Sequence, residues 1–249
     1  MASYILRKLK NPRIKNELFR GRFFEPLHLN LYALFVAVFG SYQRKIECDL
    51  VPRLQYATGL LDAVKFAQKF DTKEIAAIEF GVAAGDGLIN MAKIASKLTE
   101  QTGVNIRVYG FDTGEGMPDP IDYRDHPERW QPGDFPMDFE ALKKKLPPNA
   151  ELILGDVSET ATSFVESLPQ GCRIGFVSVD VDYYSSTVSA LKILEREPEH
   201  YLPILPIYLD DISDVMFNNS CGELLAVNEF NDRNKFRKIE YDPFLPTRR

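Results

Sequence analysis

The spacing of apolar residues changes near residue 71 and divides the chain into two regions. In residues 51–70, apolar side chains recur every three or four positions, which predicts a single amphipathic helix. After residue 71, short apolar runs alternate with amphipathic segments, a pattern typical of a parallel sheet with helices on both faces. We therefore predict an N-terminal helical extension, residues 1–70, followed by an α/β domain with a doubly wound, mostly parallel sheet, residues 71–249.

The pattern of the second region predicts alternating strands and helices. We expect strands at Ala76–Phe80, Ile106–Phe111, Glu151–Leu154, Ile174–Asp180, Ile204–Leu209 and Lys238–Tyr241. We expect helices at Gly87–Leu98, Phe139–Lys145, Thr160–Ser167, Ser186–Glu195 and Gly222–Phe230. Between the second and third strands lies a long loop, residues 112–137, that is rich in Pro, Gly and Asp. Loops of this length inside a compact domain are usually functional and often act as lids.

Composition and charge narrow the range of functions. With 249 residues, 45% of them hydrophobic, the chain can bury a full core. Its formal net charge of -6 argues against a broad nucleic-acid face. The basic run LRKLKNPRIK, residues 6–15, is either a solvated helix face or a contact for an anionic partner. Three widely spaced cysteines fit neither a disulfide framework nor a zinc site, so we expect a reduced, cytoplasmic protein.

The most apolar stretch of the chain is Leu27–Gly40. It is too short to cross a bilayer and contains His28 and Asn30, so we expect no membrane span. A buried helix is the simplest interpretation, and a membrane-surface or partner-facing helix is the alternative. Because the N-terminal region is so apolar, we also predict a homodimer.

A glycine-rich turn follows the first predicted strand, in the segment IEFGVAAGDG. Gly81, Gly85 and Gly87 lie between this strand and the next helix, at the sheet edge where open α/β folds bind ligands. Their spacing matches neither the dinucleotide fingerprint nor the phosphate loop. Glu79 and Asp86 make the segment acidic, and it contains no Lys or Arg. These features favour a ligand with a cationic end, and S-adenosylmethionine, with its sulfonium and ammonium groups, fits.

Two further acids follow the next two predicted strands. Asp112 ends the second strand, where its carboxylate could accept the ribose hydroxyls of a nucleoside ligand. Asp156 follows the third strand, where it could bind the adenine amino group. We include the adjoining Thr113 and Val157 in the predicted cofactor site. Each acid alone could equally be a turn former or a helix cap, but together with the glycine turn they predict an adenosyl-ligand site.

Four more acids follow the fourth and fifth strands, in the segments VDVDYY and LDDI. These strands are expected to be neighbours, so Asp180, Asp182, Asp210 and Asp211 should lie together. Crowded carboxylates repel one another unless a cation lies between them, and Mg²⁺ is the expected ion because all the ligands are oxygens. The alternative is that these acids only cap helices and form turns.

The blocks FDTGEGMP, FVSVDVDYYSST, YLDDI and CGELLAVNEF resemble class I S-adenosylmethionine-dependent methyltransferases, and within them the macrocin O-methyltransferase family. The resemblance covers roughly residues 75 to 231 and implies a Rossmann-like methyltransferase fold. It also implies Mg²⁺-assisted O-methylation of a hydroxylated small molecule, such as a sugar. By position, Asp180, Asp210 and Asp211 match the family's metal-ligand pattern, and Asp180 could also be the catalytic base.

Several features depart from that family or remain ambiguous. The long acidic loop is an extension, which leaves open an acceptor other than a macrolide or aminocoumarin sugar. Within this loop, His126 is a candidate for the acceptor pocket. Tyr183 is a second candidate, and for both residues plain packing is the alternative. Glu223 and Glu229 are expected on the solvent face of the last helix. Where the family's sheet closes with a strand pair, only residues 238–241 are convincing, and the run PFLP could replace the last strand in irregular form.

Two rival functions stay open at this point. A non-catalytic protein would keep the S-adenosylmethionine pocket but transfer nothing. A nicotinamide-dependent oxidoreductase or epimerase would bind NADH instead, although the glycine spacing argues against it.

Overall fold

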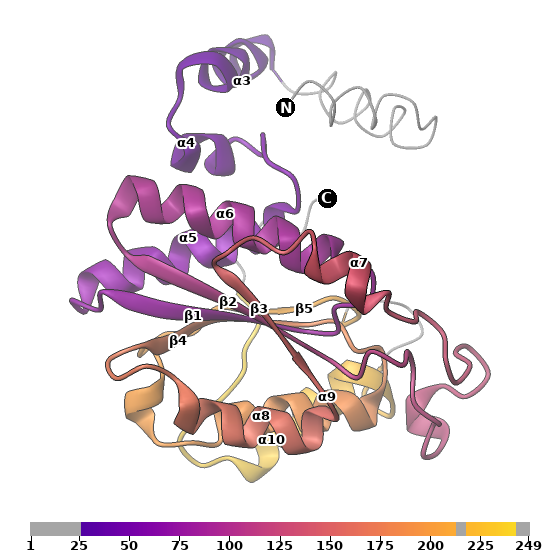
Figure 1. Cartoon of the computed structure of the whole chain (residues 1–249). Coiled ribbons are helices and arrows are strands. Elements are labelled where there is room, and N and C mark those ends of the chain that lie inside the picture. Colours follow the sequence, from indigo (N-terminus) through magenta and orange to yellow (C-terminus); the bar gives the residue numbers. More distant parts are fainter. Residues whose placement is uncertain (1–25, 213–217, 243–249) are drawn as a thin grey trace. The chain divides into compact units, whose positions relative to one another are not determined.

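A computed structural model describes residues 26–212 and 218–242 (Figure 1). The basic run at residues 6–15 and the PFLP run at residues 243–246 lie outside this range. Contacts divide the chain into two compact units, Met1–Val51 and Pro52–Arg249. By this division, the helix predicted in residues 51–70 belongs to the second unit. The boundary that we expect after residue 70, between the helical extension and the α/β domain, stays a prediction.

The described part of the first unit consists of two helices, α3 (Leu27–Phe39) and α4 (Tyr42–Glu47). Ser41 begins α4 by accepting a hydrogen bond from the backbone N–H of Arg44. In α3 only Ala33 and Val36 are buried, and most of its large apolar side chains are exposed. In the parts of the chain that the structure describes, no helix is both long and apolar enough to cross a membrane.

The second unit is built on a sheet of five parallel strands in the order β3-β2-β1-β4-β5. The strands are β1 (Glu74–Phe80), β2 (Asn105–Asp112), β3 (Ala150–Leu154), β4 (Arg173–Val179) and β5 (Ile207–Leu209). The predicted parallel sheet is therefore confirmed, including the pairing of the fourth and fifth strands. The chain reverses its direction of winding between β1 and β4, the place where such sheets form a ligand crevice.

The sixth predicted strand, Lys238–Tyr241, is wrong: the structure has no strand there. The side chain of Asn231 uses the backbone groups that a strand would need. It accepts a hydrogen bond from the N–H of Ile239 at 2.7 Å and donates one to the carbonyl of the same residue at 2.8 Å. An alternating sequence pattern cannot reveal this competition.

Helices cover both faces of the sheet (Figure 1). One face carries α5 (Leu54–Lys69) and α6 (Asp86–Thr102), and the other carries α8 (Val157–Ser167), α9 (Tyr184–Leu191) and α10 (Gly222–Arg233). The short helix α7 (Phe139–Lys143) precedes β3. Single turns of 3-10 helix occupy Tyr123–Asp125, Lys192–Leu194 and Pro198–His200. All five helices predicted after residue 71 are present, with ends that shift by a few residues.

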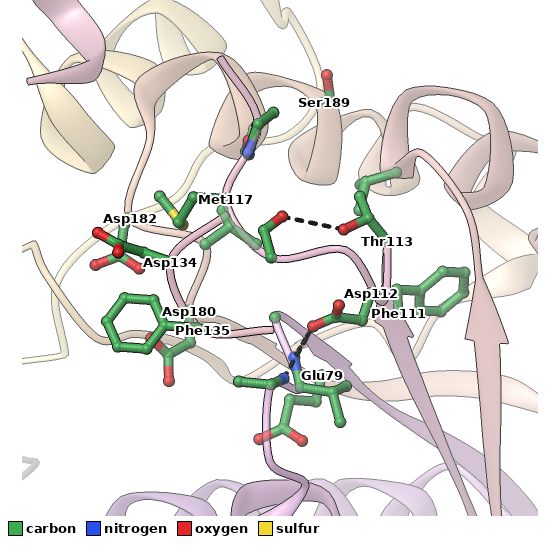
Figure 2. A pocket seen from close by; sticks show the side chains of 18 of the residues that line it. Glu79, Phe111, Asp112, Thr113, Met117, Asp134, Phe135, Asp180, Asp182 and Ser189 are labelled. Carbon is green, nitrogen blue, oxygen red and sulfur yellow. Dashed lines mark hydrogen bonds between the residues drawn. The ribbon is translucent and has the colours of Figure 1, made fainter. Parts of the chain in front are cut away.

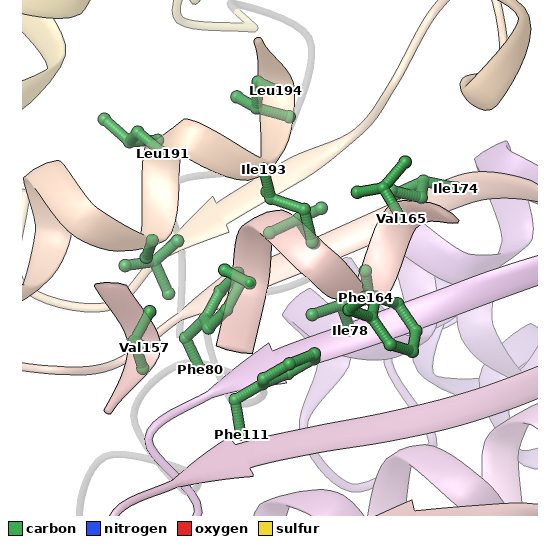
Figure 3. Packing of buried hydrophobic residues seen from close by; sticks show 14 of the residues in the cluster. Ile78, Phe80, Phe111, Val157, Phe164, Val165, Ile174, Leu191, Ile193 and Leu194 are labelled. Carbon is green, nitrogen blue, oxygen red and sulfur yellow. The ribbon is translucent and has the colours of Figure 1, made fainter. Parts of the chain in front are cut away.

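A layer of aromatic side chains joins the sheet to α8 (Figure 3). The Phe111 ring lies 5.0 Å from that of Phe80 and 5.1 Å from that of Phe164, and Phe164 also contacts Tyr109 at 4.7 Å. Truncating a buried phenylalanine to alanine typically costs about 3–5 kcal/mol. This layer therefore holds the carboxyl ends of β1 and β2 against α8. The candidate site begins at these strand ends.

Candidate functional site

A pocket of about 670 Å³ opens at the carboxyl ends of the strands (Figure 2). Small-molecule sites commonly have this size. Most of the residues predicted for the cofactor and its surroundings line it: Glu79, Gly81, Gly87, Asp112, Thr113, Asp156, Val157, Asp180 and Asp182. The long loop also contributes, through residues 116–119, 121 and 134–135. The sheet edge thus gathers side chains from distant parts of the sequence, from Glu79 to Asp182.

Backbone hydrogen bonds keep the ends of neighbouring strands in register. The N–H of Gly81 donates to the carbonyl of Phe111 at 2.9 Å, and the N–H of Asp180 donates to the carbonyl of Phe80 at 2.9 Å. The N–H of Asp210 continues the ladder to Val179 at 3.1 Å. The strands therefore end at nearly the same height, which is why Asp112, Asp156 and Asp180 line one pocket.

The glycine turn is required by close packing as well as by backbone conformation. Gly81 has φ 84°, and a Cβ atom there would lie 1.7 Å from the carbonyl oxygen of Asp180. Gly85 has φ 83°, and its Cβ would lie 2.1 Å from a methyl group of Leu142. Both positions need a residue without a side chain. The turn lets β1 and β4 approach each other beneath the pocket, and Gly85 itself lies in the turn without lining the pocket.

Asp112 organises this turn. One of its carboxylate oxygens accepts hydrogen bonds from the backbone N–H groups of Val82 and Ala83, at 2.8 and 2.9 Å. The other oxygen accepts one from Gly114 at 2.7 Å. A carboxylate has about four acceptor positions, so one position is left for a ligand. Asp112 can bind one ribose hydroxyl directly, whereas the sequence suggested that it could bind both.

Asp156 caps α8, because its side chain accepts a hydrogen bond from the backbone N–H of Ser158 at 2.7 Å. It lines the pocket as well, so the capping and the ligand-binding interpretations are compatible. Its neighbour Val157 supplies an apolar wall. On the β2 side, the hydroxyl of Thr113 donates to the carbonyl of Gly116 at 3.1 Å and shapes the start of the long loop (Figure 2).

Glu79 is a buried carboxylate at the floor of the pocket. It accepts a hydrogen bond from the hydroxyl of Tyr56, on α5, at 2.6 Å. The pKa of Glu79 is raised to about 8, mainly by burial and to a smaller extent by the negative charges of Asp180 and Asp112. The Tyr56 hydrogen bond and the positive charge of Arg53 act in the opposite direction. A cationic ligand group beside Glu79 would stabilise its ionised form.

Three carboxylates cluster at the opposite side of the pocket from Asp112. One oxygen from each of Asp180, Asp182 and Asp211 lies within 4.8 Å of the others. Burial, and after it the charges of Asp210 and Asp211, raises the pKa of Asp180 to about 7. Burial and the charge of Asp211 also raise the pKa of Asp182. Figure 2 shows Asp180 and Asp182 across the hollow from Asp112 and Thr113.

This cluster differs from the predicted ligand set of Asp180, Asp210 and Asp211. The strand β4 ends at Val179, and Asp182 brings its carboxylate back to the cluster through a left-handed turn with φ 57°. Asp210 lies outside the three, and its carboxylate accepts a hydrogen bond from the hydroxyl of Tyr208. A ligand role for Asp210 stays a prediction.

Glu223 was expected on a solvent face, and that expectation is wrong. The side chain is fully buried at the start of α10, where it accepts a hydrogen bond from the backbone N–H of Asp211 at 3.0 Å. Burial and the charge of Asp211 raise its pKa well above the usual value. Glu229, on the same helix, is half-buried and accepts a hydrogen bond from the hydroxyl of Tyr184 at 2.6 Å.

The long loop is attached to α9 by a buried carboxylate. Asp125 accepts hydrogen bonds from the backbone N–H and the hydroxyl of Ser185, at 2.8 and 2.9 Å, and from the N–H of Ile121 at 2.9 Å. Next to it, the guanidinium of Arg124 lies 4.3 Å from the centre of the Tyr184 ring. Ser185 and Ile121 line the pocket, so this attachment fixes part of its wall.

Two candidates for the acceptor pocket lie elsewhere. His126 is buried in the long loop, with a ring nitrogen 3.4 Å from Glu128, and Tyr183 is buried completely; neither lines the pocket. The sequence missed Tyr56, Arg53, Glu223 and Asp125. The segment VPRLQY lies about 25 positions before the glycine turn in the sequence. Only the packing of α5 on the sheet brings Tyr56 to Glu79 and Arg53 to the pocket lining.

No protein-family model matches the chain, and no curated protein sequence matches it. Among solved structures, the O-methyltransferase NovP has a TM-score of 0.51 and 17% sequence identity, over 72% of this chain and 72% of NovP. CalS11, a calicheamicin methyltransferase, has a TM-score of 0.49 and 20% identity, over 87% of this chain and 89% of CalS11. The strand order, the crevice at the β1–β4 switch point and the likeness to NovP agree: this chain has the Rossmann-like fold of class I methyltransferases.

Proposed function

We propose that the protein is an S-adenosylmethionine-dependent O-methyltransferase whose acceptor is a hydroxylated small molecule, such as a sugar. The observation that supports this most is a single pocket in which the glycine turn, Asp112 and Asp156 meet Asp180 and Asp182. The glycine turn, Asp112 and Asp156 lie at the ends of β1, β2 and β3, whereas Asp180 and Asp182 lie at the end of β4. A donor on one side and an acceptor on the other would share this one pocket. The narrower membership of the macrocin family stays a prediction.

The donor half of the pocket suits an adenosyl ligand with positive charge. Asp112 keeps one acceptor position for a ribose hydroxyl, and Asp156 lies at the next strand end, where an adenine would follow. The turn at Gly81 allows the ligand to approach the backbone closely. The acidic lining would stabilise a sulfonium and an ammonium, and it would disfavour the phosphates of a dinucleotide.

The acceptor half supplies a base. In the proposed reaction, an acceptor oxygen forms a bond to the methyl carbon while the bond from that carbon to sulfur breaks. The hydroxyl proton passes to the carboxylate of Asp180, which lines the pocket beside Asp182. The long loop contributes two apolar side chains, Met117 and Phe135, to the pocket lining (Figure 2). Holding the two reactants in this geometry would supply much of the rate.

The acid cluster fits a hard divalent cation. Three carboxylate oxygens converge from two adjacent strand ends. Burial, and after it the mutual repulsion of the carboxylates, raises the pKa values of Asp180 and Asp182. Asp180, Asp182 and Asp211 would hold Mg²⁺, which when bound would orient the acceptor's hydroxyls and favour their ionised form.

Calorimetry with S-adenosylhomocysteine tests the donor site. We expect the wild type to bind it, Asp112→Asn to bind about 10-fold more weakly or worse, and Asp138→Asn, which changes the cap of α7 outside the pocket, to bind as wild type. No binding by the wild type would overturn the proposal. Binding of NADH instead would support an oxidoreductase, and binding without product from any of a panel of hydroxylated acceptors would identify a non-catalytic protein.

Titration with Mg²⁺ tests the metal site and separates the two ligand sets. We expect Mg²⁺ to raise the thermal midpoint of the wild type and of Asp210→Asn, and to have no effect on Asp182→Asn or Asp211→Asn. If Asp210→Asn abolishes the effect and Asp182→Asn does not, the set predicted from the sequence is the correct one. No effect of Mg²⁺ on the wild type would remove the metal from the proposal.

A further inference from the structure

The pocket contains a single basic side chain among many acids. Of the described residues that line it, eight are Asp or Glu and only Arg53 is Lys or Arg. Arg53 directly precedes α5, in the left-handed backbone conformation with φ 47°. A residue with a side chain pays about 1–2 kcal/mol for that conformation. The backbone is therefore held in a costly state that directs a guanidinium to an acidic cavity.

Arg53 stays available for a ligand. Within the described residues, its guanidinium makes no ion pair with a carboxylate at 4.0 Å or less. Its nearest aromatic contact is the ring of Tyr56, 5.4 Å from the guanidinium carbon to the ring centre. The Arg53 charge lowers the pKa values of both Glu79 and Asp180, so the guanidinium lies near the ends of β1 and β4.

The strand order fixes the direction of a donor in this pocket. Asp156 and Asp112 follow β3 and β2, so an adenosyl group bound by them lies over one half of the sheet. The rest of the ligand must then extend toward β1 and β4, the half that contains Glu79, Asp180 and Arg53. Glu79 has one buried carboxylate oxygen without a hydrogen-bond partner among the described residues, and Glu79 lines the pocket. A buried acid and an arginine at the same end are complementary to an amino acid, which carries an ammonium and a carboxylate.

We propose that Arg53 binds the carboxylate of the donor's amino-acid end, while Glu79 faces its ammonium. The inference rests on the proposed function and adds the residue that selects a donor with an intact amino-acid group. Methyl transfer leaves this group unchanged, so Arg53 binds substrate and product equally. Its loss raises KM for S-adenosylmethionine and leaves kcat unchanged.

Two ligands that share the adenosyl group test this role. S-adenosylhomocysteine has the amino-acid end, and 5′-methylthioadenosine lacks it. In calorimetry, Arg53→Met lowers the affinity for S-adenosylhomocysteine by roughly 10- to 100-fold and leaves the affinity for 5′-methylthioadenosine unchanged. Arg53→Lys keeps part of the affinity. Arg107→Met is the control, because Arg107 pairs with Glu74 at the start of β1 and lies outside the pocket lining.

A measurement on the wild type makes the test independent of variant folding. Decarboxylated S-adenosylhomocysteine keeps the ammonium and lacks the carboxylate, so it binds the wild type more weakly by the same factor that Arg53→Met costs the parent ligand. An unchanged affinity on decarboxylation overturns the inference, as does an equal loss of both ligands in Arg53→Met. If the wild type binds neither S-adenosylhomocysteine nor 5′-methylthioadenosine, the proposed function itself fails.

Discussion

The backbone N–H of Asp211 donates a hydrogen bond of 3.0 Å to the carboxylate of Glu223. The two residues are twelve positions apart, and the bond joins the end of the fifth strand to the first turn of α10. Both are buried. Glu223 therefore sets the position of one member of the acid cluster without lining the pocket itself.

Replacing Glu223 tests this positioning role. Glu223→Ala removes the carboxylate that accepts the hydrogen bond from the Asp211 N–H, which should lower the free energy of unfolding by about 1–3 kcal/mol. If the cluster binds Mg²⁺, the same change should weaken binding about 10- to 100-fold, as is typical for the supports of metal ligands. Glu223→Gln keeps an acceptor oxygen and should recover most of both losses. Equal behaviour of the two variants in urea unfolding and Mg²⁺ titration would contradict this role.

The raised pKa of Glu79 predicts a pH-dependent stability of the ligand-free protein. Its pKa is about 8 in the folded state against an ordinary value of 4.5, so the folded protein keeps a proton that the unfolded chain releases. This contribution is fully present below about pH 4.5 and is lost as the pH rises through about 8. In urea unfolding at pH 5 and pH 8.5, Glu79→Gln should therefore lose less stability than the wild type over this range. Parallel profiles for the two proteins would show that Glu79 does not titrate as described.

The attachment of the long loop predicts an asymmetry between two neighbouring acids. The buried carboxylate of Asp125 accepts three hydrogen bonds, and Asp125→Asn replaces one of its two acceptor oxygens by an NH₂ group. This change should destabilise the protein by about 1–3 kcal/mol. It should also expose the loop to limited proteolysis. Asp122→Asn changes a partly exposed ion pair with Arg124 and should destabilise the protein much less than Asp125→Asn. Similar proteolysis rates for both variants would argue against the attachment.

Two glycines with positive φ should differ in their tolerance of alanine. Gly103→Ala places its Cβ in open space and should cost only the left-handed conformation, about 1–2 kcal/mol. Gly81→Ala meets the carbonyl oxygen of Asp180 in addition, and that crowding should cost about 1–3 kcal/mol more. Urea unfolding measures both. An equal loss would mean that β1 and β4 can separate at this point without cost.

The homodimer stays a prediction, and α3 is the place to test it. Phe35 and Phe39 are exposed and their rings lie 5.3 Å apart. If α3 forms the interface, Phe35→Glu should convert a dimer to a monomer in sedimentation velocity. Lys93→Glu, an exposed change on α6, should leave the dimer intact. A wild-type protein that sediments as a monomer would remove the prediction.

The strands could be predicted because buried parallel strands read as apolar runs. Prolines and side-chain competition explain the errors. Pro206 has no N–H to donate, and β5 begins after it at Ile207, although the apolar run starts at Ile204. At residues 238–241 the alternating pattern is present, but Asn231 uses the backbone groups of Ile239. Both errors arise from interactions that an apolar pattern does not record.

The site could be predicted only as far as strand ends reveal it. Each acid directly after a strand, such as Asp112 or Asp180, was found because parallel strands end at a common edge. Asp210 and Asp211 could not be ranked, since adjacent residues point in different directions and the orientation depends on packing. Arg53 directly precedes α5, Tyr56 lies on α5 and Glu223 lies on α10. Their approach to the sheet edge is a tertiary contact that no local spacing encodes.

The attachment of Asp125 to Ser185 has a consequence for how new acceptors could be accommodated. It anchors one stretch of the pocket wall, while Met117, Pro118 and Phe135 project from the same loop without sharing that anchor. Libraries that diversify these three positions and retain Asp125 should yield folded proteins with altered acceptor preference. Libraries that also vary Asp125 should yield mainly destabilised proteins.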